Sequence, residues 1–150
     1  LANSKNIDQQ VQLLMDDVGL ARASLRKYPH EFSGGQRQRI AIGRAIATKP
    51  ELIIADEPVS ALDVTIQAQV LDLILNLVER HNLTMLFISH DLSVVRYISD
   101  RVVVMNKGVI IECGDTEALW ANPQQQYTQQ LLKAIPLADP KSERLRMVDS

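Results

Sequence analysis

The chain has 150 residues, of which 46% are hydrophobic and 23% are charged, and its net charge is −2. These values are typical of a soluble globular domain with one core. The weak acidity gives no argument for nucleic-acid binding, and aromatic residues, at 4%, are too few for a base-stacking surface. The single cysteine, Cys113, excludes an internal disulfide framework or a multi-cysteine metal site, and we expect it to pack within a hairpin. No apolar run approaches the ~20 residues that a membrane-spanning helix needs.

The first third of the chain predicts two helices joined by a loop. Apolar residues recur at helical spacing over residues 7–18, and Gly19 is the expected stop. Residues 28–35 contain a proline, a serine and two glycines, which indicates a loop. Ser33 is then placed to cap a second helix, expected over residues 35–48.

The middle of the chain alternates strands and helices. Residues 52–55 and 84–88 are short apolar runs, which predict strands buried on both faces, and a long amphipathic helix is expected between them over residues 66–80. This order indicates parallel βα units, whose ligands bind at the carboxyl ends of the strands. The polar side chains expected at those ends are Asp56, Glu57 and His90.

Shorter elements are predicted beyond the second strand. They are a helix over residues 92–98, a hairpin of residues 101–106 and 109–112 turning at Lys107-Gly108, and two helices over residues 117–121 and 126–134. From Pro136 onward the composition predicts a tail.

A glycine pair at a helix start is the first candidate site. Gly34 and Gly35 follow Ser33 and open the second helix, so free backbone N–H groups and the positive end of the helix dipole favour an anion there. Gln36 adds a side-chain donor. A helix-start turn without a ligand is the alternative interpretation of these residues.

Adjacent carboxylates at a strand end are the second candidate site. Asp56 can hold Mg²⁺, directly or through water, and Glu57 can orient or deprotonate an attacking water. The alternative is a pair of solvated loop acids. His90 can contact a transferring phosphate or be structural, and Asp63 can serve simply as the cap of the next helix.

Four motifs in one order identify a family resemblance. They are Phe32-Ser33-Gly34-Gly35-Gln36, the run Ile-Ile-Ala-Asp-Glu-Pro at 53–58, the run Ser-Ala-Leu-Asp at 60–63, and the run Ile-Ser-His-Asp at 88–91. Together they resemble the ATP-binding-cassette (ABC) ATPases. Three further segments, residues 28–31, 68–70 and 126–132, look like the oligopeptide and dipeptide importer subgroup.

The resemblance implies a role for each candidate residue. Ser33, Gly34, Gly35 and Gln36 correspond to the signature loop. Asp56 and Glu57 end the Walker B strand, Asp63 ends the D-loop, and His90 is the switch histidine. Glu57 and His90 are therefore expected to be catalytic and Asp56 to serve the metal. The nucleotide-binding residues implied are Ser33, Gly34, Gly35, Gln36 and Asp63.

The implied fold is α/β, the C-terminal part of a P-loop NTPase fold of the ABC type. Residues 1–35 would be a remnant of the helical subdomain that ends in the signature loop. Residues 36–114 would form part of the parallel βα catalytic core with the hairpin, and residues 115–150 the C-terminal helices and tail. Gly43 departs from the alanine usual in the family, and a glycine inside a helix costs about 0.5–1 kcal/mol relative to alanine.

The family's P-loop is missing from this sequence. None of its six glycines is followed by Lys-Ser or Lys-Thr, which the motif needs to cradle phosphates. In the family, two cassettes pair head to tail, and the signature loop of one covers the ATP held by the other. We therefore expect this chain, by itself, to be inactive, with ATP and Mg²⁺ as cofactors of the full-length protein.

The resemblance implies the ATPase subunit of an importer for peptides or similar solutes. Its expected partners are a second ABC ATPase subunit and transmembrane permease subunits, without nucleic acid, and its expected location is the cytoplasmic face of the cell membrane. Two alternatives stay open at this point. One is a non-transport ABC ATPase of DNA repair or translation, and the other is a non-catalytic dimerisation module.

Overall fold

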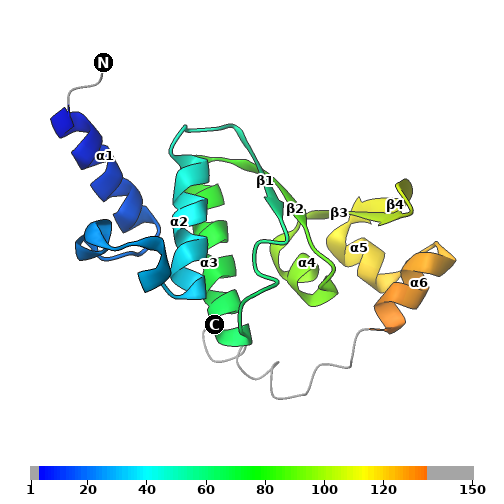
Figure 1. Cartoon of the computed structure of the whole chain (residues 1–150). Helices are drawn as coiled ribbons and strands as arrows, with labels where there is room; N and C mark the ends of the chain where they lie inside the picture. The colour runs from blue at the N-terminus through cyan, green and yellow to red at the C-terminus, as the bar shows by residue number, and fades with distance from the viewer. Residues whose placement is uncertain (1–3, 135–150) are drawn as a thin grey trace, which may run out of the picture. The chain divides into compact units, whose positions relative to one another are not determined.

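The computed structural model describes residues 4–134, and its internal contacts divide the chain into two units, residues 1–89 and 90–150 (Figure 1). The tail predicted from Pro136 lies outside the described residues. The first unit contains α1 (Ser4–Asp17), the 3₁₀ turns η1 (Arg22–Arg26) and η2 (Pro29–Glu31), α2 (Gly34–Ile46), β1 (Leu52–Asp56), α3 (Val64–His81) and β2 (Thr84–Ile88). The second unit contains α4 (Leu92–Ile98), β3 (Arg101–Asn106), β4 (Val109–Asp115), α5 (Thr116–Ala121) and α6 (Gln126–Lys133). No helix within residues 4–134 is both long enough and apolar enough to span a membrane.

The helices of the first unit pack around one apolar cluster. Helix α2 lies beside α3 (Figure 1), and the end of α1 packs against both through buried side chains. The buried members of this cluster are Val18, Leu20, Ile46 and Leu77. Helix α1 ends as predicted, because Gly19 takes a φ of 66° that suits a helix C-terminus. The carbonyl of Val18, at the end of the helix, then accepts a hydrogen bond from Arg39 at 3.0 Å.

Gly43 has a packing reason that the sequence did not reveal. A Cβ atom at this position would lie 3.3 Å from Cγ1 of Val18, which is tighter than most real contacts. Glycine therefore lets the end of α1 approach α2 closely. Glycine lowers the stability of the helix relative to alanine, but at position 43 it also allows closer packing of the buried Val18 side chain.

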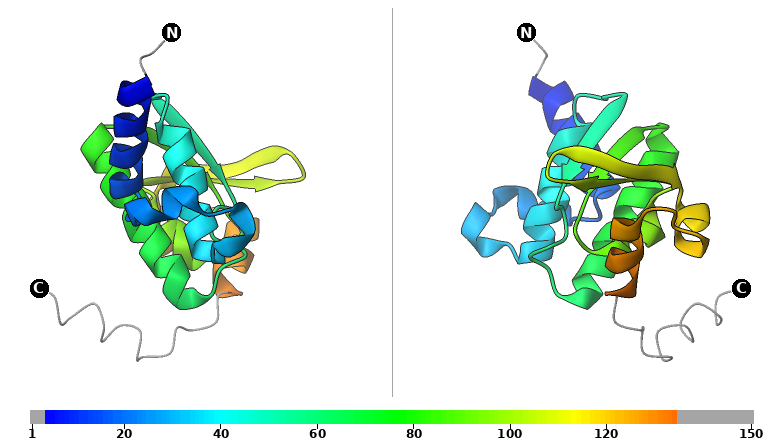
Figure 2. Two further views of the ribbon diagram at one scale, coloured as in Figure 1. Left: turned by 60° about the vertical axis from the view of Figure 1, so that its left-hand side comes forward. Right: turned by 90° about the vertical axis from the view of Figure 1, so that its right-hand side faces the viewer.

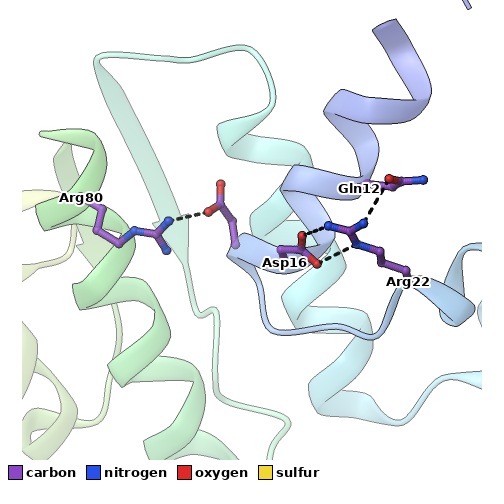
Figure 3. A network of polar contacts seen from close by, with 5 residues as sticks. Gln12, Asp16, Arg22 and Arg80 are labelled. Carbon is purple, nitrogen blue, oxygen red and sulfur yellow. Dashed lines mark hydrogen bonds and ion pairs between the residues drawn. The ribbon is translucent and has the colours of Figure 1, made fainter. Parts of the chain in front are cut away.

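Ion pairs at the surface add little to this packing. Asp17 meets Arg80 of α3 at 2.7 Å, and Asp16 meets Arg22 at 2.6 Å (Figure 3). The hydrogen bond and charge of Arg22 hold the pKa of Asp16 below its ordinary value. Because solvent reaches both pairs, they add little to stability, so the apolar cluster holds the helices together.

Strands β1 and β2 form a parallel pair, as predicted, in which Leu52 lies opposite Thr84 and Asp56 opposite Ile88. One face of the pair meets α2 and α3. Side chains from both helices and both strands line a cavity of about 230 Å³ on that side.

The prediction that these strands are buried on both faces is wrong. The side chains on the opposite face of the strand pair are 43–62% exposed, and they are Leu52, Ile54, Leu86 and Ile88. The difference arises because, within the described residues, helices cover only one face of the pair.

The second unit is built on the predicted hairpin. Strands β3 and β4 are antiparallel (Figure 2), and Lys107 and Gly108 turn with φ values of 49° and 78°, the positive values that a tight hairpin turn favours. Val102, Val104 and Leu119 form its core. Cys113 is exposed, contrary to the expectation that it packs, because β4 places it opposite the exposed Val103.

A carboxylate of β4 holds the start of α6. Glu112 accepts hydrogen bonds from the backbone N–H groups of Gln124 at 2.8 Å and Gln125 at 3.2 Å. The Thr128 hydroxyl is buried and makes no hydrogen bond of full geometry, but it faces the same carboxylate. That hydroxyl, followed by the two amides, lowers the pKa of Glu112 below its ordinary value.

We expect the second unit to lose stability in acid through Glu112. Its lowered pKa means that the ionised carboxylate stabilises the folded state at neutral pH, and this contribution is lost as the pH falls through the folded-state pKa. Thermal unfolding between about pH 7 and about pH 3 should therefore show a shallower pH dependence in Glu112→Gln than in the unaltered chain. Thr128→Val is the control, because it keeps the shape and the carboxylate while removing the hydroxyl, and should raise the pKa of Glu112 in an NMR titration. An unchanged slope in Glu112→Gln would contradict the assignment.

Candidate functional site

The first turn of α2 is a capping box. The Ser33 hydroxyl oxygen accepts a hydrogen bond from the backbone N–H of Gln36 at 3.3 Å, and the Gln36 side-chain oxygen accepts one from the backbone N–H of Ser33 at 3.1 Å. The predicted cap at Ser33 is confirmed. Gln36, expected only as a donor to a ligand, also orders the loop itself. The hydroxyl hydrogen of Ser33 and the amide nitrogen of Gln36 keep donor capacity.

The two glycines of this turn differ in their surroundings. Gly35 is buried, and a Cβ atom there would lie 2.4 Å from Cγ2 of Ile66, a distance that forces atoms to move. Gly34 is exposed, and a Cβ atom there would meet Leu62 at an ordinary 3.4 Å. Packing against α3 therefore requires glycine at position 35. At position 34 packing does not require glycine, and the role predicted for Gly34 in binding an anion stays a prediction.

Helix α3 begins beside this turn. Its N-cap is Asp63, whose side chain accepts a hydrogen bond from the backbone N–H of Ile66 at 3.0 Å, which confirms the predicted cap. Because Ile66 also lies against Gly35, the structure brings the starts of α2 and α3 together. The first amides of a helix have no intrahelical partner, so two sets of such donors lie near each other in the first unit.

The adjacent carboxylates Asp56 and Glu57 lie where β1 ends. Asp56 is exposed and occupies the last position of the strand. Glu57 takes a positive φ of 48°, which is uncommon for a residue with a side chain. Its backbone N–H donates to the carbonyl of Ile88 at 2.9 Å, and its carbonyl accepts from the Ser60 amide at 3.4 Å and the Ser60 hydroxyl at 3.1 Å.

His90 follows the end of β2 by two residues and is the first residue of the second unit. The neighbouring Asp91 caps α4 by accepting a hydrogen bond from the backbone N–H of Ser93 at 2.9 Å. The catalytic role of His90 stays a prediction.

The described residues suit a metal ion that takes most of its ligands from water and from a bound phosphate compound. Within residues 4–134, no three His, Cys, Asp or Glu side chains gather as a metal cage. Asp56, exposed at the end of β1, stays the predicted Mg²⁺ donor. Mg²⁺ commonly binds through one or two carboxylates, with waters and substrate phosphates completing its shell. The donor set therefore suits Mg²⁺ that arrives with a nucleotide.

The sequence alone did not predict the hydrogen bonds from Ser60 to the Glu57 carbonyl. The signal for them was a serine three residues after Glu57 in a loop, where a hydroxyl commonly bonds the nearby backbone. The sequence also did not predict the contact between Gly35 and Ile66, which are 31 positions apart in the sequence.

Comparison with known proteins places these features in one family. The family model described as ABC transporter matches residues 2–60. The oligopeptide transport ATP-binding protein OppF of Streptococcus pyogenes serotype M1 is 56% identical over 136 residues, which are 91% of this chain and 44% of that protein. OppF of Bacillus subtilis (strain 168) is 56% identical over 139 residues, 93% of this chain and 46% of that protein. The dipeptide transport ATP-binding protein DppF of Lactococcus lactis subsp. cremoris is 55% identical over 139 residues, 93% of this chain and 45% of that protein.

The fold agrees with the sequence comparison. A solved structure of a metal-chelate type ABC transporter in an inward-facing conformation matches with a TM-score of 0.71 and 33% identity, over 85% of this chain and 49% of that one. The chain spans less than half the length of these curated relatives. Its α/β architecture is that of the C-terminal part of an ABC cassette, and the chain belongs to the ABC transporter family of ATP-binding proteins.

Proposed function

We propose that this chain is part of the ATPase subunit of an importer that couples ATP hydrolysis to the uptake of oligopeptides or dipeptides. One observation carries the proposal. The chain is 54–56% identical to peptide-transport ATP-binding proteins. Its first unit places the two glycines that begin α2 beside the start of α3, which Asp63 caps, and the same unit contains Asp56 and Glu57. The arrangement suits binding of a phosphate chain and attack of water on it.

Each residue then has a chemical role in the complete protein. Glu57 orients the attacking water and Asp56 serves Mg²⁺, while His90 contacts the terminal phosphate. The signature loop, Ser33 to Gln36, and Asp63 bind nucleotide held by a second ATPase subunit. Bound ATP with Mg²⁺ supplies the transferable phosphate.

The partners follow from the same proposal. A second ATPase subunit completes the nucleotide site, and transmembrane permease subunits carry the solute. The protein would then lie at the cytoplasmic face of the membrane, held there by the permease. No nucleic acid enters this scheme.

Transport is the test that separates this proposal from a DNA-repair or translation ATPase. Cells that lack the protein should lose uptake of labelled oligopeptides or dipeptides, and the unaltered gene should restore it. The tagged protein should co-purify with membrane permease subunits. Unchanged peptide uptake, together with co-purification of nucleic acid or ribosomes, would refute the transport function.

We expect the 150-residue chain alone to bind ATP weakly. Its sequence contains no P-loop lysine to neutralise phosphates, and the signature loop is proposed to serve a partner's nucleotide. Calorimetry with Mg-ATP should give a Kd well above the micromolar range. A full-length protein that contains the chain is the positive control. A micromolar Kd for the chain alone would show that it has a nucleotide cradle of its own.

A further inference from the structure

We propose that Ser60 is a positioning residue for Glu57. Its hydroxyl holds the Glu57 backbone in the left-handed conformation and thereby sets the direction of the Glu57 carboxylate. This inference rests on the proposed function, in which Glu57 orients the attacking water.

The conformation of Glu57 needs a cause. Within residues 4–134, the other non-glycine residues with positive φ lie where the chain leaves a helix or turns a hairpin, and they are Lys49, Asn82 and Lys107. Glu57 instead directly follows a strand, at the residue that carries the candidate catalytic carboxylate. A left-handed backbone is unfavourable for a residue with a Cβ atom, so it persists only where neighbouring contacts enforce it.

Three hydrogen bonds enforce it. The carbonyl of Ile88 accepts from the Glu57 N–H at 2.9 Å and ties the residue to the end of β2. On the other side, the Glu57 carbonyl accepts from the Ser60 hydroxyl at 3.1 Å and from the Ser60 amide at 3.4 Å. Both contacts on the carbonyl side are longer than is usual for their donors, and the hydroxyl contact is the shorter of the two.

The hydrogen bonds at the N–H and at the carbonyl of Glu57 have different effects. The bond to Ile88 fixes where Glu57 lies, whereas the bonds from Ser60 oppose rotation of its carbonyl. Because the direction of the Cα–Cβ bond follows from the backbone torsions, rotation to a right-handed conformation would re-aim the carboxylate. Only the hydroxyl bond can be removed by a side-chain substitution, since the other two join backbone atoms.

A direct role of Ser60 at the nucleotide makes a different prediction. Ser60 is exposed, and a hydroxyl that contacted nucleotide would chiefly change its affinity. A hydroxyl that acts through Glu57 changes the fraction of molecules with a correctly aimed carboxylate, and so it changes kcat without changing the KM for ATP.

The experiment uses the full-length subunit that contains this chain, assembled with its partners. Ser60→Ala should lower kcat about three- to tenfold, the range that one neutral hydrogen bond accounts for, with the KM for ATP unchanged. Ser60→Thr keeps the hydroxyl and should restore kcat to within about twofold. In a Glu57→Gln background, Ser60→Ala should cause no further loss, because it acts through the carboxylate already removed.

A structural measurement accompanies the kinetics. In the 150-residue chain, the Glu57 amide should exchange with solvent faster in Ser60→Ala than in Ser60→Thr, because a loosened peptide breaks its bond to Ile88 more often. A raised KM with unchanged kcat, an additive loss in the double variant or equal amide exchange would overturn the inference. If Glu57→Gln itself retained turnover, the proposed role of Glu57 would fail instead, so the two failures are distinguishable.

Discussion

Glu57→Gln should reduce ATP turnover of the full-length subunit by at least about 100-fold, which is the lower end of what a positioned general base contributes. The substitution keeps the size of the side chain and one acceptor oxygen but removes the negative charge that orients and polarises water. The backbone of Glu57 should stay in place, because its hydrogen bonds with Ile88 and Ser60 use main-chain atoms of Glu57, which the substitution leaves unchanged. Nucleotide binding should therefore survive while hydrolysis is lost.

A matched control lies at the other end of the same strand. Glu51 is exposed and directly precedes β1, so Glu51→Gln makes the same chemical change away from the candidate site. It should leave turnover within about twofold of the unaltered subunit, as a surface change distant from the chemistry does. Phosphate release measures turnover, and calorimetry measures nucleotide binding. Near-normal hydrolysis by Glu57→Gln would remove Glu57 from the proposed mechanism.

Gly35→Ala should chiefly lower the stability of the fold, whereas Gly34→Ala should chiefly lower ATP turnover. Gly35→Ala would place a methyl group 2.4 Å from Cγ2 of Ile66, and overpacking of this kind costs about 1–3 kcal/mol of folding free energy. Gly34→Ala meets only an ordinary contact with Leu62, so its free energy of unfolding should change by less than about 1 kcal/mol. Turnover of the full-length subunit should nevertheless fall in Gly34→Ala, because its methyl group keeps phosphate away from the backbone.

Removing the opposing methyl tests the cause of the Gly35 effect. Ile66→Ala lacks Cγ2, so the double variant Gly35→Ala/Ile66→Ala should lose less stability than the sum of the two single variants. Denaturant unfolding of the 150-residue chain measures all four proteins. Additive losses would show that the contact with Ile66 is not what excludes a side chain at position 35.

Local chemistry made much of the fold predictable from the sequence. Ser33 and Asp63 cap α2 and α3, Gly19 ends α1, and Lys107-Gly108 turns the hairpin, each through bonds or torsions within a few residues. Such signals need no knowledge of the rest of the chain. The parallel pairing of β1 and β2 followed from the strand–helix–strand order.

The sequence by itself therefore determined where the helices and strands lie and which side chains stand at their ends. Contacts between distant residues decided the rest. The uncovered face of β1 and β2 depends on which elements pack above the sheet, and the different demands on Gly34 and Gly35 depend on Ile66. The positive φ of Glu57 depends on Ile88 in another strand. Residue type and spacing do not encode these distances, because they arise only when separate elements pack against one another.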